Sequence, residues 1–291
     1  MKTPFTKQWI LKTGIPIVKS YNGNLTLRGL HYRLVAAGMI NDVSHYKKVV
    51  NAMIDARWEG LVQFTDFLDH EREMLGQTDF EQTDVESKVE QAKEAIRYWA
   101  TSYRKNMWEN QPYYPEVFIE KKALQGVFEE PCKRMSVALN PCKGYPSLTF
   151  LYDAAMRFEE AINQGKTPII LYFGDYDPSG ENIPETIVEN LYRMSGETIE
   201  LRRIALNEQQ VIDWNLPPAP TKDSDTRSAN WAGLGQVELD AVEPNKIVKM
   251  CYGAIEDIFD RDLYEELMRT QREEKEEFKT ILKNDFNTLL D

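Results

Sequence analysis

Residues Leu171–Ile183 read LYFGDYDPSGENI and contain the most informative change of composition in the chain. The apolar run 168–173 predicts a buried β-strand, and this strand ends at Gly174. Asp175 and Asp177 follow at once, and a Pro-Ser-Gly sequence then turns the chain toward a predicted helix. A strand that delivers two carboxylates to a loop presents the oxygen ligands that Mg²⁺ prefers. The alternative is an ordinary solvated turn.

A second predicted strand, Glu116–Ile119, also ends in a carboxylate, because it leads into Glu120–Lys122. Loops at the carboxyl ends of strands are where open α/β sheets hold their sites. If the two strands are parallel neighbours, Glu120, Asp175 and Asp177 converge on one cluster. Crowded carboxylates require a cation nearby, or one of them takes up a proton. The two strand ends together therefore favour a metal site.

Residues 24–64 have the pattern of two short helices followed by a strand. Asn24 or Thr26 caps the first predicted helix, which ends at Gly38. Ser44 caps the second predicted helix, which Gly60 closes, and residues 61–64 read as a short strand. This order is typical of a winged helix-turn-helix, whose second helix can enter a DNA groove.

The two faces of the second predicted helix differ in polarity. Its apolar residues fall at helical spacing and are predicted to point inward: Val49, Val50, Met53, Ile54 and Trp58. Its outward face is basic and polar, which favours contact with DNA. The predicted DNA-binding residues are Lys47, Lys48, Asn51 and Arg57, joined by Lys121 at the end of the Glu116–Ile119 strand.

Arg28 and Tyr32 are four residues apart and so share one face of the first helix. The pKa of a phenol in water is about 10, so a tyrosine is almost entirely protonated at neutral pH and is a poor nucleophile. A guanidinium one turn away can stabilise the phenolate and hold a phosphate. The alternative is that Tyr32 is one of the many half-buried packing tyrosines of helices.

Glu120 followed by Asp175-x-Asp177, each at the end of a strand, resembles a Toprim domain, the metal-binding module of topoisomerases, primases and some nucleases. An Arg-x-x-x-Tyr helix in a winged-helix domain ahead of such a domain resembles the A subunit of the type IIB DNA topoisomerases (topoisomerase VI) and the related meiotic double-strand-break proteins. Gly144–Ser147 and Val237–Ala241 are part of this resemblance, and the second is similar to a phage or prokaryotic branch of the group. The resemblance covers residues 24–255.

The resemblance implies a role for each matching residue. Tyr32 corresponds to the nucleophile that attacks a backbone phosphate and becomes joined to the 5′ end, and Arg28 is the basic residue beside it. Glu120, Asp175 and Asp177 correspond to the acids that hold Mg²⁺, for which Mn²⁺ can substitute, and Glu120 also counts as catalytic. In this family the tyrosine of one subunit works against the metal site of the other, which implies a homodimer on double-stranded DNA.

Composition sets limits on these interpretations. The 291 residues leave room for two domains, and three cysteines with three histidines disfavour a disulfide framework or a zinc site. No Gly-x-x-x-x-Gly-Lys-Ser/Thr loop occurs, so a separate subunit must supply any ATPase. No 18-residue apolar run or signal peptide is found, which predicts a soluble, cytoplasmic protein without membrane contact.

The net charge of −12 is unusual for a protein that binds DNA, but the charges are unevenly distributed. Residues 1–60 contain nine Lys or Arg against three Asp or Glu, whereas residues 254–291 contain six against twelve. A local basic face is sufficient for contact with phosphates. The acidic C-terminal end is predicted to keep the protein soluble or to limit non-specific binding.

The predicted fold class is α/β, with an N-terminal winged helix-turn-helix domain followed by a Toprim domain that has a Rossmann-like, mostly parallel sheet. The predicted divisions are 1–73 for the winged-helix domain, 74–111 for a linker and connecting helix, 112–255 for the Toprim domain and 256–291 for an acidic helical tail. Further predictions are loops at Leu75–Ser87 and Trp214–Trp231, helices at Val85–Lys105, Thr149–Asn163 and Leu267–Leu290, and a strand at Glu200–Leu206.

Two other functions use the same residues. A Toprim nuclease would cut DNA with a metal-bound water, and Tyr32 would then be structural; the nuclease subunit of plasmid-defence systems built around SMC proteins resembles the chain in this way. A DNA-binding module without catalysis would keep the helices and tolerate loss of the acids. The presence of Glu120, Asp175 and Asp177 counts against the second of these.

Overall fold

The computed structural model describes residues 5–21, 25–67, 84–218 and 235–289. The chain divides into two compact units. Met1–Arg72 and Tyr113–Ile258 form the first unit, and Glu73–Pro112 and Phe259–Asp291 form the second. All the candidate site residues belong to the first unit.

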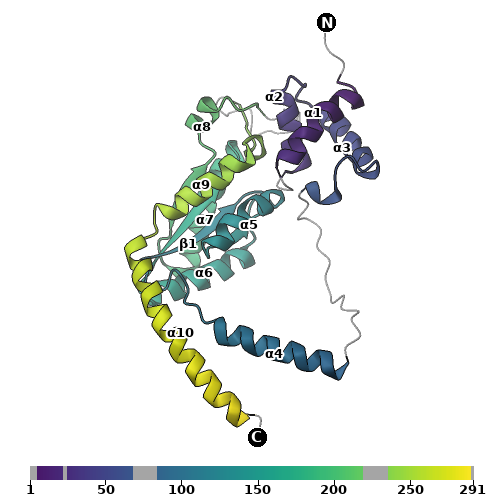
Figure 1. The fold of residues 1–291 in the computed structure, drawn as a ribbon. Helices are drawn as coiled ribbons and strands as arrows, with labels where there is room; N and C mark the ends of the chain where they lie inside the picture. The colour runs from purple at the N-terminus through teal and green to yellow at the C-terminus, as the bar shows by residue number, and fades with distance from the viewer. Residues whose placement is uncertain (1–4, 22–24, 68–83, 219–234, 290–291) are drawn as a thin grey trace. The chain divides into compact units, whose positions relative to one another are not determined.

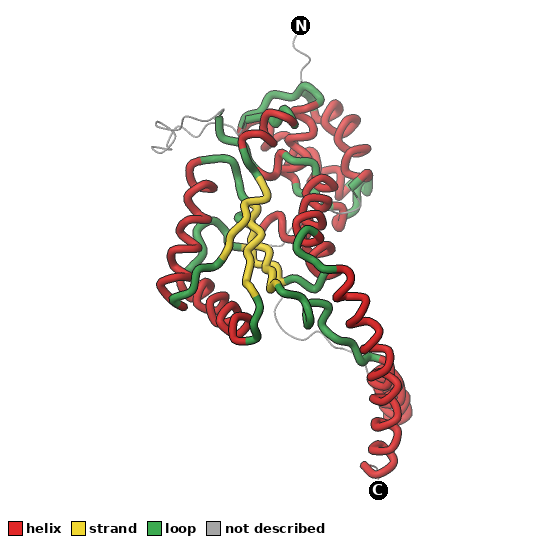
Figure 2. The backbone as a smooth tube through the Cα atoms, turned by 90° about the vertical axis from the view of Figure 1, so that its left-hand side faces the viewer, coloured by secondary structure: helices red, strands yellow, loops and turns green. Residues whose placement is uncertain are grey.

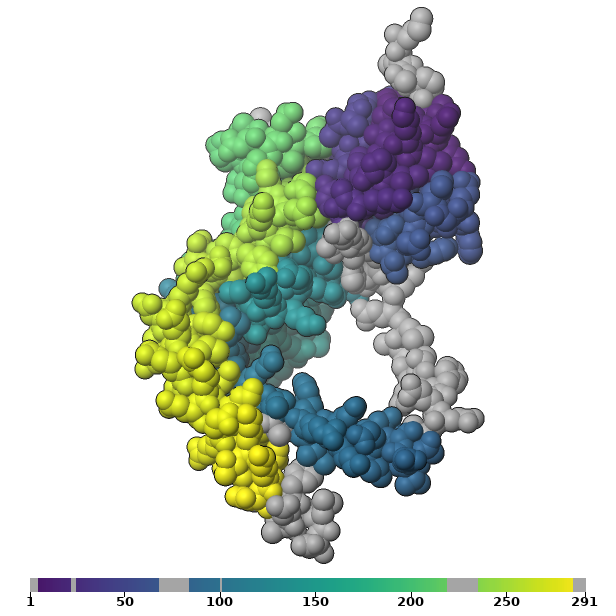
Figure 3. All heavy atoms as spheres, viewed as in Figure 1, coloured from purple at the N-terminus to yellow at the C-terminus, as the bar shows by residue number. Residues whose placement is uncertain are grey.

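Three helices form the N-terminal part of the first unit: α1 (Lys7–Ser20), α2 (Leu27–Ala36) and α3 (Val43–Trp58). They share an apolar core, and their atoms form one packed body, coloured purple to blue in Figure 3. The two helices predicted in residues 24–60 are confirmed, whereas α1 was not predicted. The core residues include Ile10 and Val18 of α1, so α1 completes the burial that two short helices alone could not provide.

The ends of α2 and α3 depend on local hydrogen bonds. The Thr26 side chain accepts from Gly29 N and caps α2, so Thr26 is the one of the two predicted caps that α2 uses. Asp42, not Ser44, caps α3, because its carboxylate accepts from His45 N at 2.7 Å. The prediction of Ser44 as this cap was therefore wrong by two residues.

The strand predicted at residues 61–64 is absent from the described structure. A 3₁₀ turn, η1 (Phe64–Asp66), occupies part of this segment, and Gln63 and Asp66 stabilise it by a reciprocal capping box. Leu61 and Phe64 are 41% and 60% exposed, so neither residue supplies the burial that would favour a strand. Just after η1, Phe67 pairs with Leu25 through one isolated parallel bridge, which is shorter than a strand.

The face that α3 buries is narrower than its apolar residues suggested. Val49 and Met53 are fully buried, as predicted, and Val50 is half-buried. Ile54 and Trp58 are 41% and 78% exposed, so their predicted inward orientation was wrong. Alanines 52 and 56 face the core in their place, because these small side chains allow the helices to pack closely.

Four strands form a wholly parallel sheet in the order β2-β1-β3-β4, drawn in yellow in Figure 2. Their bounds are Tyr113–Ile119 for β1, Ala138–Pro141 for β2, Thr167–Phe173 for β3 and Glu200–Ala205 for β4. The predicted strands of β1, β3 and β4 are confirmed, and β2 was not predicted. The parallel sheet agrees with the predicted α/β class, and helices lie on both sides of it (Figure 2).

Helices cover both faces of the sheet (Figure 1). On one face, α6 (Leu148–Asn163) and α7 (Pro178–Ser195) form a core with Phe118 and Tyr172. On the other, α5 (Gln125–Arg134) places Phe128 against Phe173 with ring centroids 4.8 Å apart, and α9 (Pro244–Glu256) contacts α5. Short elements η2 (Lys122–Leu124), α8 (Glu208–Asp213) and η4 (Leu239–Ala241) complete this unit.

The strand order creates a switch point between β1 and β3. The chain leaves β1 through α5 on one face of the sheet, and it leaves β3 through α7 on the opposite face. The two loops therefore separate above the carboxyl ends of these strands. In open α/β sheets a crevice at such a point is the usual place for a ligand.

The second unit consists mainly of α4 (Val85–Thr101) and α10 (Arg261–Leu289). Tyr103 donates to Glu274 at 2.6 Å, and Gln111 exchanges two hydrogen bonds with the main chain of Asp260. The predicted helix Val85–Lys105 starts correctly but ends at Thr101, and the predicted helix Leu267–Leu290 falls on α10, which already begins at Arg261.

The two predicted loops lie only partly in the described residues. In Leu75–Ser87, Asp84 caps α4 and residues 85–87 are already helical, so the end of that loop was wrongly predicted. The rest of Leu75–Ser87, and residues 219–231 of Trp214–Trp231, lie outside the described residues. Within the part of the chain that the structure describes, no helix is long and apolar enough to cross a membrane.

Candidate functional site at the carboxyl edge of the sheet

The ends of β1 and β3 lie side by side, as the sequence predicts for two parallel neighbours. Ile119 and Phe173 are partners in the register, and Glu120 N donates to Phe173 O at 2.9 Å. Glu120 and Asp175 therefore enter the switch point from its two sides. Their side chains are nearly buried, with 8% and 5% of the residues exposed.

Glu120 touches the loop that carries the two aspartates. Its Oε2 accepts from Asp175 N at 2.9 Å and from the Tyr172 hydroxyl at 3.4 Å. Burial raises the pKa of Glu120, and the charge of Asp177 raises it further. The carboxyl group is thus held where ionisation is costly unless positive charge is close.

Both carboxylate oxygens of Asp175 have partners inside the first unit. Oδ1 accepts from Leu239 N at 2.7 Å, and Oδ2 pairs with Lys121 Nζ at 2.9 Å. Burial is the main cause that raises the pKa of Asp175 to about 7; Glu120 adds to the increase, and Lys121 opposes it. Asp175 is therefore a buried acid in a cluster of other acids.

Asp177 has a second task at the start of α7. Its Oδ1 accepts from Gly180 N at 2.6 Å and caps the helix. Gly180 is required there, because a Cβ at this position would lie 2.2 Å from Asp175 O. Arg203 of β4 also holds this loop, since it donates to Asp175 O and Gly180 O at 2.6 Å each.

Carboxylates of this kind are suitable ligands for a hard cation, and Glu120, Asp175 and Asp177 do share one loop region. Among the described residues, however, no group of three or more His, Cys, Asp or Glu side chains is arranged to hold a metal ion. Asp175 is already engaged with Lys121 and the main chain, and Asp177 caps α7. Three carboxylates are suitable donors for a divalent cation. In this structure, however, their oxygens do not converge on one point where a cation could bind.

Glu238 and Asp240 are site residues to which the sequence interpretation assigned no role. Lys121 Nζ lies 3.2 Å from Glu238 Oε2 and 3.1 Å from Asp240 Oδ2, in addition to its contact with Asp175. Burial alone lowers the pKa of Lys121, but Asp240, Asp175 and Glu238 together raise it above its usual value. Lys121, which was predicted to contact DNA, is therefore a cation held by three carboxylates of its own chain.

The segment that carries Glu238 and Asp240 joins the N-terminal helices to the sheet edge. Val237 and Tyr176 form a two-bond antiparallel bridge on the sheet side. On the helix side, Thr26 donates to Asp240 Oδ1 at 3.3 Å, and Arg33 donates to Ala241 O. The alternation of apolar and acidic residues in Val237–Ala241 was the sequence pattern that could have drawn attention to Glu238 and Asp240. It could not show that this segment contacts residues more than 200 positions away in the chain.

Arg28 and Tyr32 lie at this junction. Arg28 Nη1 contacts both carboxylate oxygens of Glu238 at 2.7 Å. Tyr32 is 2% exposed. Burial raises the pKa of Tyr32, and the charge and hydrogen bond of Glu238 add to this effect, while Lys121 and Arg28 oppose it. The structure thus brings the predicted nucleophile and its arginine to the acidic edge of the same chain.

The other predicted DNA-binding residues lie on α3. Lys47, Lys48 and Asn51 are exposed, and Arg57 is half-buried with its guanidinium 4.6 Å from the centre of the Phe67 ring. The exposed residues form a polar surface in the first half of α3. Arg57 instead contributes to packing at the end of the N-terminal core.

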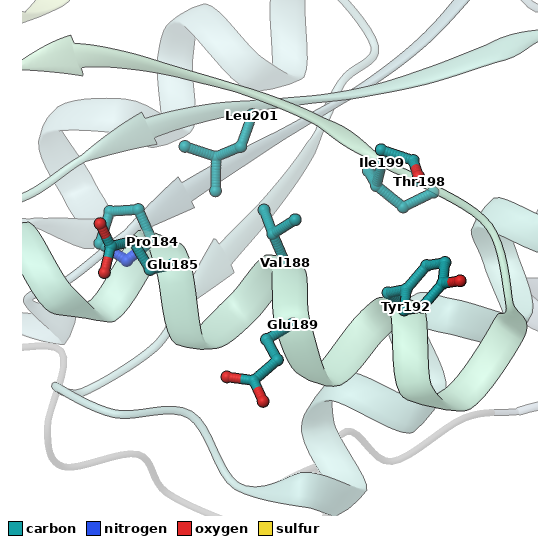
Figure 4. Close-up of a pocket in the computed structure, with 8 residues that line it drawn as sticks. All are labelled: Pro184, Glu185, Val188, Glu189, Tyr192, Thr198, Ile199 and Leu201. Carbon is teal, nitrogen blue, oxygen red and sulfur yellow. The ribbon is translucent and has the colours of Figure 1, made fainter.

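A separate shallow cavity of about 610 Å³ lies between α7 and the start of β4 (Figure 4). Its described lining comes from α7 and from Thr198–Leu201, with Val188, Ile199 and Leu201 providing apolar surface. The charged edge described above is the part of the unit where titratable side chains gather, and it is the better candidate site.

Comparisons of the chain with family models, with curated proteins and with solved structures found no match. The activity is therefore inferred from the site's own residues.

Proposed function

We propose that this chain is a DNA-cutting transesterase similar to the A subunit of topoisomerase VI. In this proposal residues 5–67 act as a winged-helix-like domain and the parallel sheet as a Toprim-like domain. One arrangement carries the proposal: Tyr32 and Arg28 lie next to Lys121 and Glu238, at the same sheet edge as Glu120 and Asp175. The packing of α2 on α1 and α3 does not by itself require Arg28 and Tyr32 to lie at an acidic cluster, so this arrangement supports a functional role for the two residues.

The proposed chemistry exchanges one phosphodiester bond for another. The Tyr32 hydroxyl oxygen forms a bond to phosphorus and loses its proton, while the bond from phosphorus to the 3′ oxygen breaks and that oxygen gains a proton. The 5′ end remains joined to Tyr32, so the break can be resealed. Arg28 holds the phosphate by charge-assisted hydrogen bonds, as guanidinium groups do in phosphate sites.

Glu120, Asp175 and Asp177 are the residues that would hold Mg²⁺, or Mn²⁺ in its place. A bound cation would offset the negative charge that develops on the phosphate and on the 3′ oxygen. The raised pKa values of Glu120 and Asp175 support this assignment, because acids that are difficult to ionise gain most from a nearby cation.

The proposed partners follow from the same chemistry. Lys47, Lys48 and Asn51 are exposed on α3 and suit contact with double-stranded DNA. Cutting both strands needs two tyrosines, which supports a homodimer, and a separate subunit would supply ATPase activity. Since Arg28, on the helix of Tyr32, shares the Glu238 carboxylate with Lys121 of its own chain, we propose that each chain cuts with its own tyrosine rather than with that of a partner.

A hydrolytic Toprim-like nuclease is the second candidate. It is favoured by the burial of Tyr32, whose hydroxyl is inaccessible and holds its proton more tightly than a free phenol. In that case Glu120, Asp175 and Asp177 would serve a metal-bound water, and Tyr32 would support packing at the junction.

The test is cleavage of supercoiled plasmid with Mg²⁺ or Mn²⁺, stopped with detergent and divided into samples with and without proteinase. We expect cut DNA with protein on its 5′ ends, and no such adduct from Tyr32→Phe, which keeps the ring but removes the nucleophilic oxygen. Tyr46→Phe is the matched control on α3. Free 5′ ends from both the wild type and Tyr32→Phe would establish the nuclease instead.

Mixing two inactive variants tests which chain supplies the tyrosine. We expect a mixture of Tyr32→Phe and Glu120→Gln chains to stay inactive, because no chain then has a complete site. Recovery of adduct in the mixture would show that the tyrosine acts on the partner's acids, as the resemblance implies.

A further inference from the structure

We propose that Arg28, Lys121 and Tyr32 form a binding site for one backbone phosphate of DNA, and that the Glu238 carboxylate occupies this site in the free protein. The inference rests on the proposed function and adds a regulatory contact to it. Glu238 would be an internal substitute for the substrate, which the DNA phosphate must displace before Tyr32 can react.

The contacts of Glu238 are those that a phosphate at this place would make. Both of its oxygens lie 2.7 Å from Arg28 Nη1, and Oε2 lies 3.2 Å from Lys121 Nζ. Tyr32 lies on the same helix as Arg28, one turn away, and burial and the charge of Glu238 raise the pKa of its hydroxyl. An anion held by a guanidinium and an ammonium beside a hydroxyl nucleophile has the neighbours required for attack on a phosphodiester.

A carboxylate and a phosphodiester are interchangeable ligands for this set of donors. Each presents two oxygen acceptors that share one negative charge, and guanidinium groups bind either one in the same way. Because the site is mostly buried, its two cations depend on having an anion close by. The Glu238 side chain is only 16% exposed, so Arg28 and Lys121 would lose a close anion if Glu238 left without a replacement.

The displacement does not require the main chain to unfold. Val237 is fixed by its bridge to Tyr176, Leu239 N donates to Asp175 Oδ1, and Asp240 accepts from Thr26. The residues on both sides of Glu238 are therefore anchored independently of its carboxylate. Rotation of the Glu238 side chain is therefore the movement that would free Arg28 and Lys121 for another anion.

The first experiment measures binding of a fluorescently labelled DNA duplex of 20 base pairs, by anisotropy in EDTA and at fixed salt. We expect Glu238→Ala and Glu238→Gln to bind roughly tenfold more tightly than wild type, since one charge-assisted contact no longer competes with the DNA. Glu200→Ala removes the same charge from an exposed pair with Arg202 and should change affinity less than twofold. The tighter DNA binding of Glu238→Ala should disappear when Arg28→Ala is added to it, because the phosphate then lacks its guanidinium partner.

A second measurement uses the wild-type chain and so does not depend on the folding of a variant. A water-soluble carbodiimide with an amine labels accessible carboxylates, and mass spectrometry reports the labelling of Glu238. We expect saturating duplex to increase this labelling several-fold, while labelling of Glu116, which is fully buried, stays constant. Unchanged labelling of Glu238 on DNA would overturn the proposal, as would equal affinities of the wild type and the two Glu238 variants.

These results separate the inference from the proposed function. Tighter binding by the Glu238 variants without any covalent adduct would support the phosphate site and exclude the transesterase. A Tyr32-dependent adduct with unchanged affinity of the Glu238 variants would support the transesterase and exclude the internal substitute.

Discussion

Two glutamates four residues apart, one within β1 and one just after it, have opposite environments. Glu116, within β1, is fully buried: Arg157 holds both of its oxygens at 2.7 and 2.8 Å, and Asn140 donates to it at 2.7 Å. Glu120, just after β1, is buried almost as deeply, but no cation contacts it within the described residues; burial and the charge of Asp177 raise its pKa, which Lys121 and Arg203 oppose from farther away. One carboxylate is balanced by a dedicated arginine, and the other has no such partner in the part of the chain that the structure describes.

This contrast shows why burial alone does not identify a functional carboxylate. A buried ion whose partners neutralise it and fill its hydrogen bonds has a structural role. A buried ion whose neighbours have the same charge is unfavourable in isolation, and such a site is suited to a cation or a proton. Glu116 and Glu120 are therefore expected to fail in different ways when they are neutralised.

The largest effect is expected at the acidic end of the strand. Glu120→Gln should lower Mg²⁺-dependent plasmid cleavage by at least about 100-fold, since a ligand for the proposed cation is lost. The thermal unfolding temperature should stay constant or rise, because one of several repelling charges is removed. Cleavage at the wild-type rate would show that Glu120 belongs with Glu116 as a structural residue.

The opposite pattern is expected for the balanced glutamate. Glu116→Gln should reduce the free energy of unfolding by about 2 kcal/mol, because Arg157 loses its charged partner. Cleavage per folded molecule should remain at the wild-type level. Urea unfolding checks the first value, and Glu160→Gln is the control, since this exposed residue of α6 should change stability by less than about 0.5 kcal/mol. A stable but inactive Glu116→Gln would remove the distinction between the two glutamates.

The smallest effect is a difference in pH dependence. The pKa of Asp175 is raised from 3.8 to about 7 in the folded chain, so between these values the folded state binds more protons than the unfolded state. Stability from this group is therefore lost as pH rises through that window. Asp175→Asn lacks this loss, so its stability relative to wild type should be greater at pH 7 than at pH 5. Urea unfolding without divalent cations at both pH values measures the difference, and an equal difference at both would show that the fold does not perturb Asp175.

The sequence predicted the parts of the fold that depend on short-range patterns. The strands before Glu120 and Asp175 were predictable because each is a compact apolar run that ends abruptly in polar residues. α2 was predictable for a similar reason, since Thr26 caps a helix with regular apolar spacing. The pairing of β1 with β3 remained a condition of the prediction, because the two strand ends do not show by themselves that the strands are neighbours.

Features that depend on distant partners were not predictable in this way. The exposure of Trp58 depends on which face of α3 meets α1, and α1 itself was not predicted. Glu238 and Asp240 acquire their roles from Arg28, Thr26 and Lys121, which lie more than 100 residues away along the chain. No local pattern identifies such partners, so the predicted site contained the acids of the strand ends and lacked those of the connecting segment.

Arg203 has a thermodynamic consequence for the loop after β3. Its guanidinium holds the carbonyl oxygens of Asp175, Gly180 and Leu206, so the backbone of this loop is fixed by the protein itself. Binding of a ligand here does not have to order these residues, so the binding free energy is not reduced by their loss of conformational entropy, which is about 1–2 kcal/mol for each residue. The affinity of the proposed site for a cation or a phosphate would therefore be set in part by a residue that touches neither.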